Sequence, residues 1–304
     1  MKKGKKGKIY VADGNWLLHR VFFTLRTHRP IEEALPYAFL SLICKDAIAT
    51  RADRMLIAFD GPKVFRYELY PEYKANRDDK KSSGPVVDTQ FTQPQGDVYD
   101  YLPDVYRLLT EAGITYFQPR KYEADDVLRS VVHEYVPEYS VVCGAQDKDD
   151  YQFLGPGVSL YDSSRKGPDG KPKPATITAK SVMEEFGLTP AQFLQYQILL
   201  GDPIDNIPRI GNFKPLGIRK KLIEHGTIAD WYKAEPDDQR TFDVNRVKIA
   251  LNRKLVTLCK GVLPPSTPDE WKPPKVKSDE AHGFPETYHA WHSTLYPKSR
   301  GLFG

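Results

Sequence analysis

Short apolar runs alternate with helical segments in the first half of the chain. The runs are rich in β-branched and aromatic residues, which is typical of buried strands, and they lie at residues 8–12, 54–59, 114–117 and 140–145. The segments between them predict helices near residues 15–25, 37–49, 98–111 and 124–135. This alternation indicates an α/β fold with a central, mostly parallel sheet flanked by helices.

The second half of the chain is organised differently. An edge strand is expected at residues 158–161, and the polar stretch from Asp162 to Thr178 predicts a loop or hairpin. Further helices are expected at residues 179–186, 190–200, 216–225 and 244–259. Prolines accumulate after Leu263, in a tail that is either a partner-binding segment or a packed extension. We therefore divide the chain into three parts, residues 1–178, 179–263 and 264–304.

Aspartate closes three of the apolar runs. Asp13, Asp60 and Asp147 each stand where a predicted strand leaves the sheet. Because the carboxyl ends of parallel strands form one crevice, these side chains can converge despite their separation in sequence. Asp149 points the same way as Asp147 if the backbone there is extended. The start of a predicted helix adds Glu123, Asp125 and Asp126, and the segment Gly-Asp-Pro-Ile-Asp-Asn adds Asp202 and Asp205. With Asp149, the set contains nine acids.

Nine carboxylates in one crevice need positive counter-charge. Like charges a few ångströms apart repel and raise one another's pKa, so divalent cations are the expected partners. All-oxygen ligation suits Mg²⁺ or Mn²⁺, whereas Zn²⁺ would call for closely spaced His or Cys, and Cys44, Cys143 and Cys259 are far apart. Two ions roughly 3.5–4 Å apart can activate a water and stabilise the leaving oxygen of a phosphodiester. The acids therefore predict phosphodiester hydrolysis, although any single one could be a helix cap or a solvated charge.

The overall charge is positive although these acids gather at one site. The 304 residues include 44 Lys and Arg against 40 Asp and Glu, with a net charge of +4 and a pI of about 8.7. Basic residues must be in excess elsewhere, which favours a polyanionic partner. The cysteines give no disulfide framework, no apolar stretch could span a bilayer, and the basic N-terminus lacks the apolar segment of a signal peptide. We expect a soluble protein of a reducing cytoplasm, with no membrane partner.

Six short motifs stand in order along the chain. They are Val11-Ala12-Asp13-Gly14-Asn15, Ala58-Phe59-Asp60, Phe65-Arg66 with Tyr73-Lys74-Ala75-Asn76-Arg77, Tyr122-Glu123-Ala124-Asp125-Asp126, Asp147-Lys148-Asp149 and Gly201-Asp202-Pro203-Ile204-Asp205-Asn206. Together they resemble the flap endonuclease and 5′ nuclease family, above all the 5′-to-3′ exonuclease domain of bacterial DNA polymerase I and the stand-alone bacteriophage enzymes. Each motif is weak alone, but six in the right order are highly specific.

The resemblance implies roles for particular residues. The acids divide into a first metal cluster, Asp13, Asp60, Glu123, Asp125 and Asp126, and a second, Asp147, Asp149, Asp202 and Asp205. Lys74 and Arg77 resemble the cations that grip the scissile phosphate, and Tyr73 could stack on a terminal base. The arch region is expected at residues 72–97; within it the low-complexity part, Ser82–Gly96, is similar in position to the family's helical arch, and its composition predicts disorder without DNA. The alternative for these residues is a solvated charged loop with partly buried tyrosines.

The segment after Asn206 departs from the family pattern. Family members usually carry a glycine-rich hairpin there, whose amides and bound monovalent ion hold duplex phosphates. Only Gly211 and Gly217 remain, displaced from the expected pair, and Pro215 removes an amide, which argues against a K⁺ site. We still expect residues 179–263 to form a helix-hairpin-helix-like subdomain that binds duplex DNA with unusual salt sensitivity. Its candidate phosphate ligands are Lys214, Arg219, Lys220 and Lys221.

The resemblance implies a structure-selective 5′ nuclease that uses two Mg²⁺ ions, replaceable by Mn²⁺, to remove primers or 5′ flaps in replication. It would act as a monomer on DNA with 5′ flaps, 5′ ends or single-strand/duplex junctions, and on RNA–DNA hybrids. The absence of an attached polymerase favours a bacteriophage protein in the host cytoplasm or an accessory bacterial nuclease. One alternative is a PIN-type ribonuclease, which would need neither the arch segment nor the later helices. The other is a non-catalytic scaffold for branched DNA, which would be expected to lose several acids.

Overall fold

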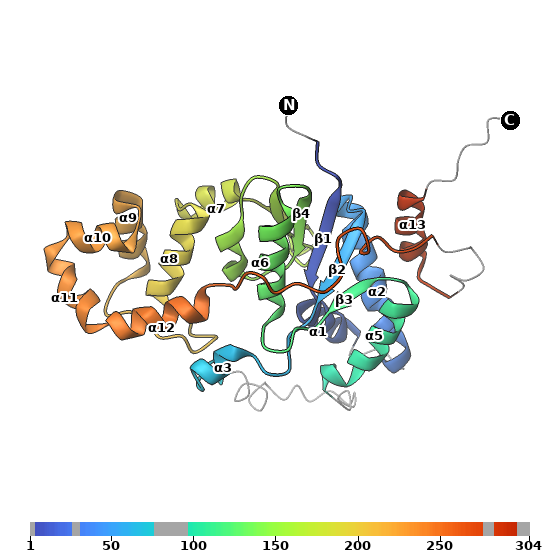
Figure 1. Ribbon diagram of the computed structural model, residues 1–304, viewed down its shortest axis with the longest axis horizontal. Helices are drawn as coiled ribbons and strands as arrows, with labels where there is room; N and C mark the ends of the chain where they lie inside the picture. Colours follow the sequence, from blue (N-terminus) through green and yellow to red (C-terminus); the bar gives the residue numbers. More distant parts are fainter. Residues whose placement is uncertain (1–3, 26–30, 76–96, 276–282, 297–304) are drawn as a thin grey trace.

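A six-stranded sheet runs through the centre of the protein (Figure 1). The computed structural model describes residues 4–25, 31–75, 97–275 and 283–296. The strands are β1 Lys8–Asp13, β2 Arg54–Ala58, β3 Thr115–Phe117, β4 Ser140–Gly144, β5 Val158–Asp162 and β6 Ala175–Ile177. They lie in the order β3-β2-β1-β4-β5-β6, and all pairs are parallel except β5 with β6. The expected α/β fold with a mostly parallel sheet is confirmed.

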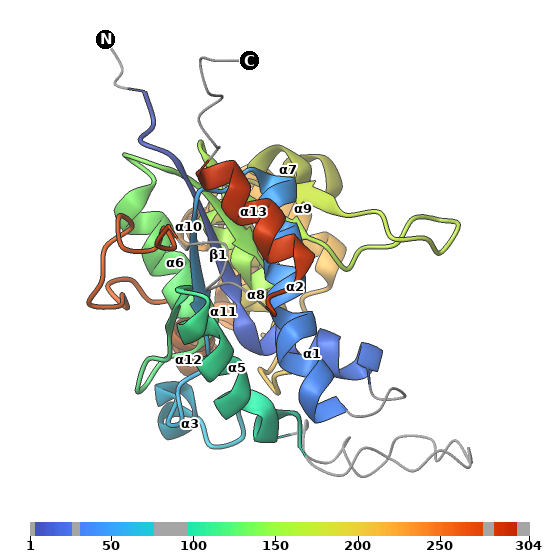
Figure 2. The same ribbon diagram turned by 90° about the vertical axis from the view of Figure 1, so that its right-hand side faces the viewer.

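Helices bury both faces of the sheet. Successive side chains of β1 point to opposite faces: Tyr10 and Ala12 join one buried cluster, and Ile9 and Val11 join the other. Figure 2 shows the helices of the first face, which are α1 Gly14–Leu25, α2 Ile31–Thr50, α5 Leu102–Glu111 and α13 Glu286–Leu295. The second face is covered by α6 Ala124–Tyr135. This double burial explains why the strands are continuous apolar runs rather than alternating ones.

A helical subdomain extends from one end of the sheet (Figure 1). Its helices are α7 Ala179–Phe186, α8 Pro190–Leu200, α9 Pro215–His225, α10 Ile228–Ala234, α11 Pro236–Val244 and α12 Arg246–Val256. The first two have the expected bounds because capping boxes at Thr178 and Thr189 fix where they begin. The short helices α10 and α11 were not predicted. They are held by tertiary packing, since Trp231 and Phe242 lie 5.1 Å apart, ring centre to ring centre, beside Phe213.

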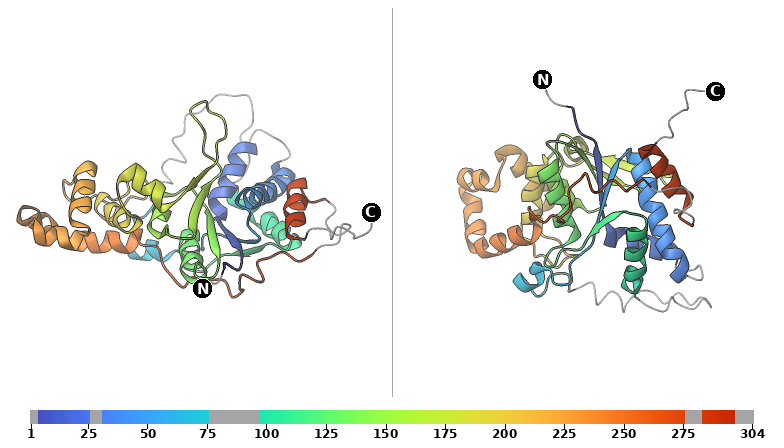
Figure 3. Two further views of the ribbon diagram at one scale, coloured as in Figure 1. Left: turned by 90° about the horizontal axis from the view of Figure 1, so that it is seen from above. Right: turned by 45° about the vertical axis from the view of Figure 1, so that its right-hand side comes forward.

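One further expectation changes in the structure, and one open alternative is decided for the described residues. The strand β5 is not the edge, because the chain turns back after it through a hairpin and adds β6 (Figure 3). The described part of the tail is a packed extension: Trp271, Tyr288 and Trp291 are fully buried. The Trp291 Nε1 donates to the carbonyl of Ala52 at 3.0 Å, which ties α13 to the sheet. No helix among residues 4–25, 31–75, 97–275 and 283–296 has the length and apolar character to cross a bilayer.

Candidate active site

A cleft of about 710 Å³ opens at the carboxyl ends of the central strands. Asp13 ends β1, Asp60 follows β2, and Asp147 follows β4. The cleft is lined by eight of the nine predicted acids: Asp13, Asp60, Glu123, Asp125, Asp147, Asp149, Asp202 and Asp205. The convergence expected from strand topology therefore occurs in the folded chain.

A sharp turn brings the last two of these acids to the cleft. The helix α8 ends at Gly201, whose φ of 68° is in the left-handed region and whose missing side chain leaves room for the carbonyl of Ile207. Backbone hydrogen bonds then join Asp202 and Ile207 in both directions, at 2.9 and 2.7 Å. The tight loop between them carries Asp202 and Asp205 into the cleft.

Burial and mutual repulsion raise the pKa values of Asp13, Asp125, Asp147 and Asp149 and disfavour their ionisation. Burial, followed by the charge of Asp60, raises the pKa of Asp13 to about 7. Burial and neighbouring negative charges also raise the pKa values of Asp125 and Asp149 well above the ordinary range. The leading neighbouring charge on Asp149 is that of Asp147. A cation bound among these oxygens would favour their ionised forms.

Buried carboxylate oxygens without partners also fit a cation. One oxygen of Asp125 is buried and accepts no hydrogen bond from any described residue, and both oxygens of Asp150 are in the same condition. No three of the cleft's described acids have oxygens within 4.8 Å of one another. That spacing suits Mg²⁺, which is usually held by one or two carboxylates and keeps several waters. The donor set is therefore compatible with the divalent ions that the sequence predicts.

Three ligand atoms elsewhere do lie within 4.8 Å of one another, but a lysine already engages their carboxylates. They belong to Glu224, His225 and Glu235 in the helical subdomain. The ammonium of Lys221 bonds to Glu235 and lies 4.0 Å from Glu224. These contacts join α9 to the residue between α10 and α11, and they offset part of the negative charge that a metal would need.

The backbone after Asp147 is not extended, which corrects one expectation. Asp147 caps the 3₁₀ helix η2 Lys148–Phe153, and its side chain accepts from the amide of Asp149 at 2.9 Å. Asp149 still faces the cleft, where it is hydrogen-bonded by the side-chain amide of Gln197. The helix also turns Asp150 inward, an acid that we did not single out from the sequence although it continues the same run.

Asp126 does not line the cleft, unlike the other eight acids. It is fully buried and forms a two-point ion pair with Arg66 of α3 (Phe65–Leu69), with N–O distances of 2.6 and 2.8 Å. The amides of Glu123 and Cys259 also donate to it, at 3.1 and 2.8 Å. Arg66 also donates a hydrogen bond to Glu123, at 2.9 Å. The buried ion pair therefore holds the side chain of a residue that lines the cleft. The physical reason is that Asp126 occupies the third position of α6 and points back toward its start.

The expected phosphate-binding segment is only partly described. Lys74 lines the cleft and its ammonium bonds to Glu123. Its φ of 59° is unusual for a residue other than glycine, and a hydrogen bond from its amide to the carbonyl of Asp205, at 3.0 Å, holds it there. Tyr73 is 4 % exposed with its hydroxyl on Glu123, so its ring is not available for a base to stack on. Arg77 and most of the expected arch, residues 76–96, lie outside the described residues.

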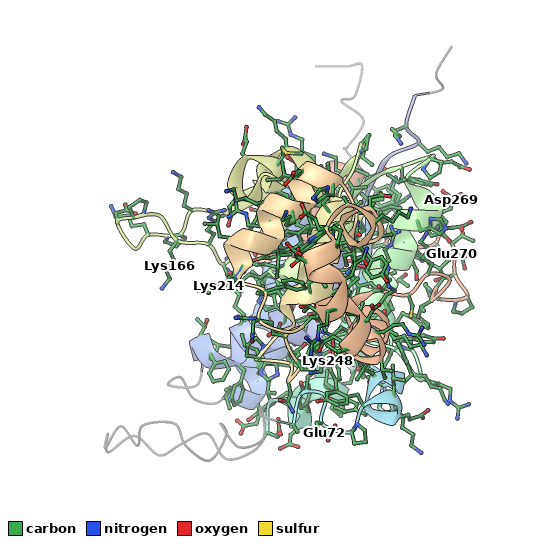
Figure 4. All side chains as sticks on the ribbon, turned by 90° about the vertical axis from the view of Figure 1, so that its left-hand side faces the viewer. Glu72, Lys166, Lys214, Lys248, Asp269 and Glu270 are labelled. Carbon is green, nitrogen blue, oxygen red and sulfur yellow. The ribbon has the colours of Figure 1, made fainter. Side chains whose placement is uncertain are left out.

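The predicted duplex-binding cations differ in their exposure. Lys220 is exposed on α9, and Lys214 is exposed at the residue just before this helix. Arg219 instead donates to the carbonyl of Phe186 at 2.8 Å, and Lys221 is bonded to Glu235, so these two are engaged within the protein. Viewed from the helical end, Figure 4 shows Lys214 and Lys248 on the subdomain. Exposed cations of α12 that the sequence analysis did not single out are Arg246, Lys248, Arg253 and Lys254.

The fold and the acidic cleft together define a protein of the 5′ nuclease class. Residues 8–187 match the family model described as "5′-3′ exonuclease, N-terminal resolvase-like domain". Because this match covers more than half of the chain, the chain belongs to that family, as the six motifs indicated.

Relatives of known sequence are bacterial DNA polymerases. The chain is 27% identical over 259 residues to the thermostable DNA polymerase I of Thermus thermophilus, covering 82% of this chain and 28% of that protein. It is 30% identical over 229 residues to DNA polymerase I of Bacillus caldotenax, covering 73% and 24% respectively. The chain thus spans about a quarter of the length of these relatives.

Solved structures of similar fold include nucleases of bacteriophage T5 and the catalytic core of Rad2. The bacteriophage T5 flap endonuclease, in a pseudo-enzyme–product complex with DNA and metal ions, has a TM-score of 0.64 at 20% identity, covering 95% of this chain and 97% of that one. The T5 5′-exonuclease with bound divalent zinc gives 0.63 at 20% identity, covering 95% and 98%. The catalytic core of Rad2 in complex with DNA substrate gives 0.54 at 16% identity, covering 96% and 88%. At these identities the likeness concerns the fold.

Proposed function

We propose that this protein is a Mg²⁺-dependent, structure-selective 5′ nuclease that hydrolyses DNA by a two-metal mechanism. The observation that carries the proposal is the convergence of eight acids on one cleft beside Lys74. Metal ions and DNA in the T5 complex, and DNA substrate in the Rad2 complex, support the same ligands here. Mn²⁺ is expected to replace Mg²⁺, whereas the displaced glycines still argue against K⁺.

Two groups of acids would hold the ions. Asp13, Asp60, Glu123 and Asp125 would surround the first, and Asp147, Asp149, Asp202 and Asp205 the second, as the resemblance groups them. One or two carboxylates of each group would bind the ion directly and the others through its waters. Bound ions would supply a water activated for attack and positive charge at the leaving oxygen. Asp126 takes a different part: through Arg66 it fixes the side chain of Glu123. The products would carry a 5′-phosphate and a 3′-hydroxyl.

Substrate binding would use both parts of the molecule. The exposed cations of α9 and α12 would contact duplex phosphates, and the cleft in residues 1–178 would receive the strand to be cut. In this division residues 179–263 are the duplex-binding subdomain and 264–304 a C-terminal extension. We infer a monomer that removes primers or 5′ flaps during replication, with RNA–DNA hybrids among its substrates.

Lys74, one of two described lysines that line the cleft, is the one that the resemblance assigns to the scissile phosphate. Replacing Lys74 by Met keeps the side-chain stem but removes the charge, and we expect kcat to fall by roughly 10²–10³, as when one preorganised charge donor is lost. DNA affinity should change much less, because other cations supply most of the phosphate contacts. The control is Lys63→Met, at a nearby exposed lysine. Equal losses of affinity and kcat would assign Lys74 to binding rather than to chemistry.

The function itself is tested by cleavage of a 5′-labelled flap duplex beside matching single-stranded and blunt DNA. With Mg²⁺ or Mn²⁺ we expect cutting near the flap junction, and with chelator we expect none. Binding should be measured in parallel by fluorescence anisotropy at several salt concentrations, because phosphate contacts weaken steeply with salt. DNA binding without cleavage under any divalent ion would refute the nuclease and favour a branched-DNA scaffold. Cleavage of RNA alone would favour the PIN-type ribonuclease.

A further inference from the structure

Asp150 is a buried acid that the nine predicted ligands do not include. It lies in η2, next to Asp149, and is fully buried. Neither of its carboxylate oxygens accepts a hydrogen bond from a described residue. A buried carboxylate in this condition is costly unless a proton or a cation compensates it.

Asp150 interacts electrostatically with the acidic cluster although it does not line the cleft. The charges that act on it most are those of Asp147, Asp13 and Asp149, and for Asp125 it is the leading neighbouring charge. Its charge also acts on the fully buried Cys143 of β4. Asp150 is therefore a buried member of the same group of acids.

Another buried aspartate shows how this protein satisfies such a group when it serves packing alone. Asp46 of α2 is 2 % exposed, but it accepts from the hydroxyls of Tyr10 at 2.8 Å and Ser163 at 2.9 Å. Asp150 has no equivalent donors among the described residues. Asp125, on which Asp150 exerts the largest charge effect, also has a buried oxygen without a partner among the described residues. The two acids thus interact electrostatically and share the same lack of hydrogen-bond donors.

We propose that Asp150 is a further ligand of the divalent centre and that, with Asp125, it holds the cation at the inner end of the cleft. One divalent ion would compensate both oxygens of Asp150 and the buried oxygen of Asp125, which accept no hydrogen bond from a described residue. The inference rests on the proposed function in one respect, which is that a divalent ion binds in this cleft.

The test measures Mn²⁺ binding by isothermal titration calorimetry and the thermal midpoint with Mn²⁺ or with chelator. For Asp150→Asn and Asp150→Leu we expect Mn²⁺ affinity to fall by roughly 10–100-fold, the range seen when groups supporting a metal are lost. The metal-free Asp150→Leu variant should melt higher than the parent, since an apolar side chain replaces a buried carboxyl group without hydrogen-bond donors, and Mn²⁺ should raise the midpoint of both variants less. Asp46→Asn is the control, a buried aspartate outside the cleft, and should leave Mn²⁺ affinity unchanged.

The outcomes separate the two proposals. Parent-like Mn²⁺ affinity in either folded Asp150 variant would overturn the role of Asp150 and leave the nuclease proposal standing. No Mn²⁺ or Mg²⁺ binding by the parent protein would overturn both. The leucine variant keeps the test decisive if asparagine is poorly tolerated, because an apolar side chain suits a site without hydrogen-bond donors.

Discussion

Replacing Asp147 and Asp202 together by Asn should reduce phosphodiester hydrolysis by at least about 10³-fold, because metal-ion catalysis supplies several kcal/mol of transition-state stabilisation. Both side chains line the cleft and both belong to the proposed second metal cluster. Asparagine keeps their size but removes two of the charges that would hold the ion. The measurement is single-turnover cleavage of the flap duplex at saturating Mg²⁺.

DNA binding distinguishes a loss of chemistry from a loss of folding. The double variant should bind the flap duplex at least as tightly as the parent, since two negative charges have been removed from the cleft. Glu134→Gln with Asp237→Asn makes the same change of charge at exposed positions outside the cleft and should leave the rate unchanged. Parent-like hydrolysis by Asp147→Asn with Asp202→Asn would show that the metal assignment is wrong.

The strand-end acids could be predicted because two local signals agree. A buried parallel strand is a continuous apolar run, and topology puts the residue after it at one edge of the sheet. Asp13 and Asp60 satisfy both conditions, and they meet in the cleft. No knowledge of distant contacts was needed.

The positions of Asp126, Tyr73 and Asp150 could not be predicted because they depend on residues far away in the chain. Asp126 is drawn to Arg66, and that pair is completed by the carbonyl of Leu255, at 2.8 Å from the guanidinium. Tyr73 was expected to stack on a terminal base, but its hydroxyl donates a hydrogen bond to Glu123 and its ring packs in the core. Asp150 points inward because residues Lys148–Phe153 form a 3₁₀ helix, which their sequence did not allow us to predict.

The helix α13 was missed although a signal was present. Tyr288 and Trp291 stand three residues apart, which is helical spacing, and both are fully buried. We predicted no helix in this tail, where prolines accumulate. These two side chains are buried because α13 packs against α2, which lies near the other end of the chain. Their burial therefore could not be inferred from the neighbouring sequence.

Replacing Arg66 by Met should destabilise the protein by about 3–5 kcal/mol at neutral pH, because removing one member of a buried ion pair leaves the other uncompensated. The Arg66 side chain is 1% exposed and Asp126 is fully buried. Urea unfolding followed by circular dichroism gives the change in free energy of unfolding. The control is Arg107→Met, whose ion pair with Asp104 is exposed and should contribute at most about 1 kcal/mol.

The pH dependence of this loss tests its cause. Burial opposes ionisation of Asp126, but the hydrogen bonds and charge of Arg66 outweigh it and lower the pKa of Asp126 below its ordinary value. A carboxyl whose pKa is lower in the folded state adds stability above its unfolded pKa of about 4, and this stability is lost as the pH falls through the folded value. The deficit of Arg66→Met should therefore be largest at neutral pH and shrink below about pH 4, as Asp126 becomes protonated in both proteins. A deficit independent of pH would assign the loss to packing of the guanidinium against α12 and α6 rather than to its charge.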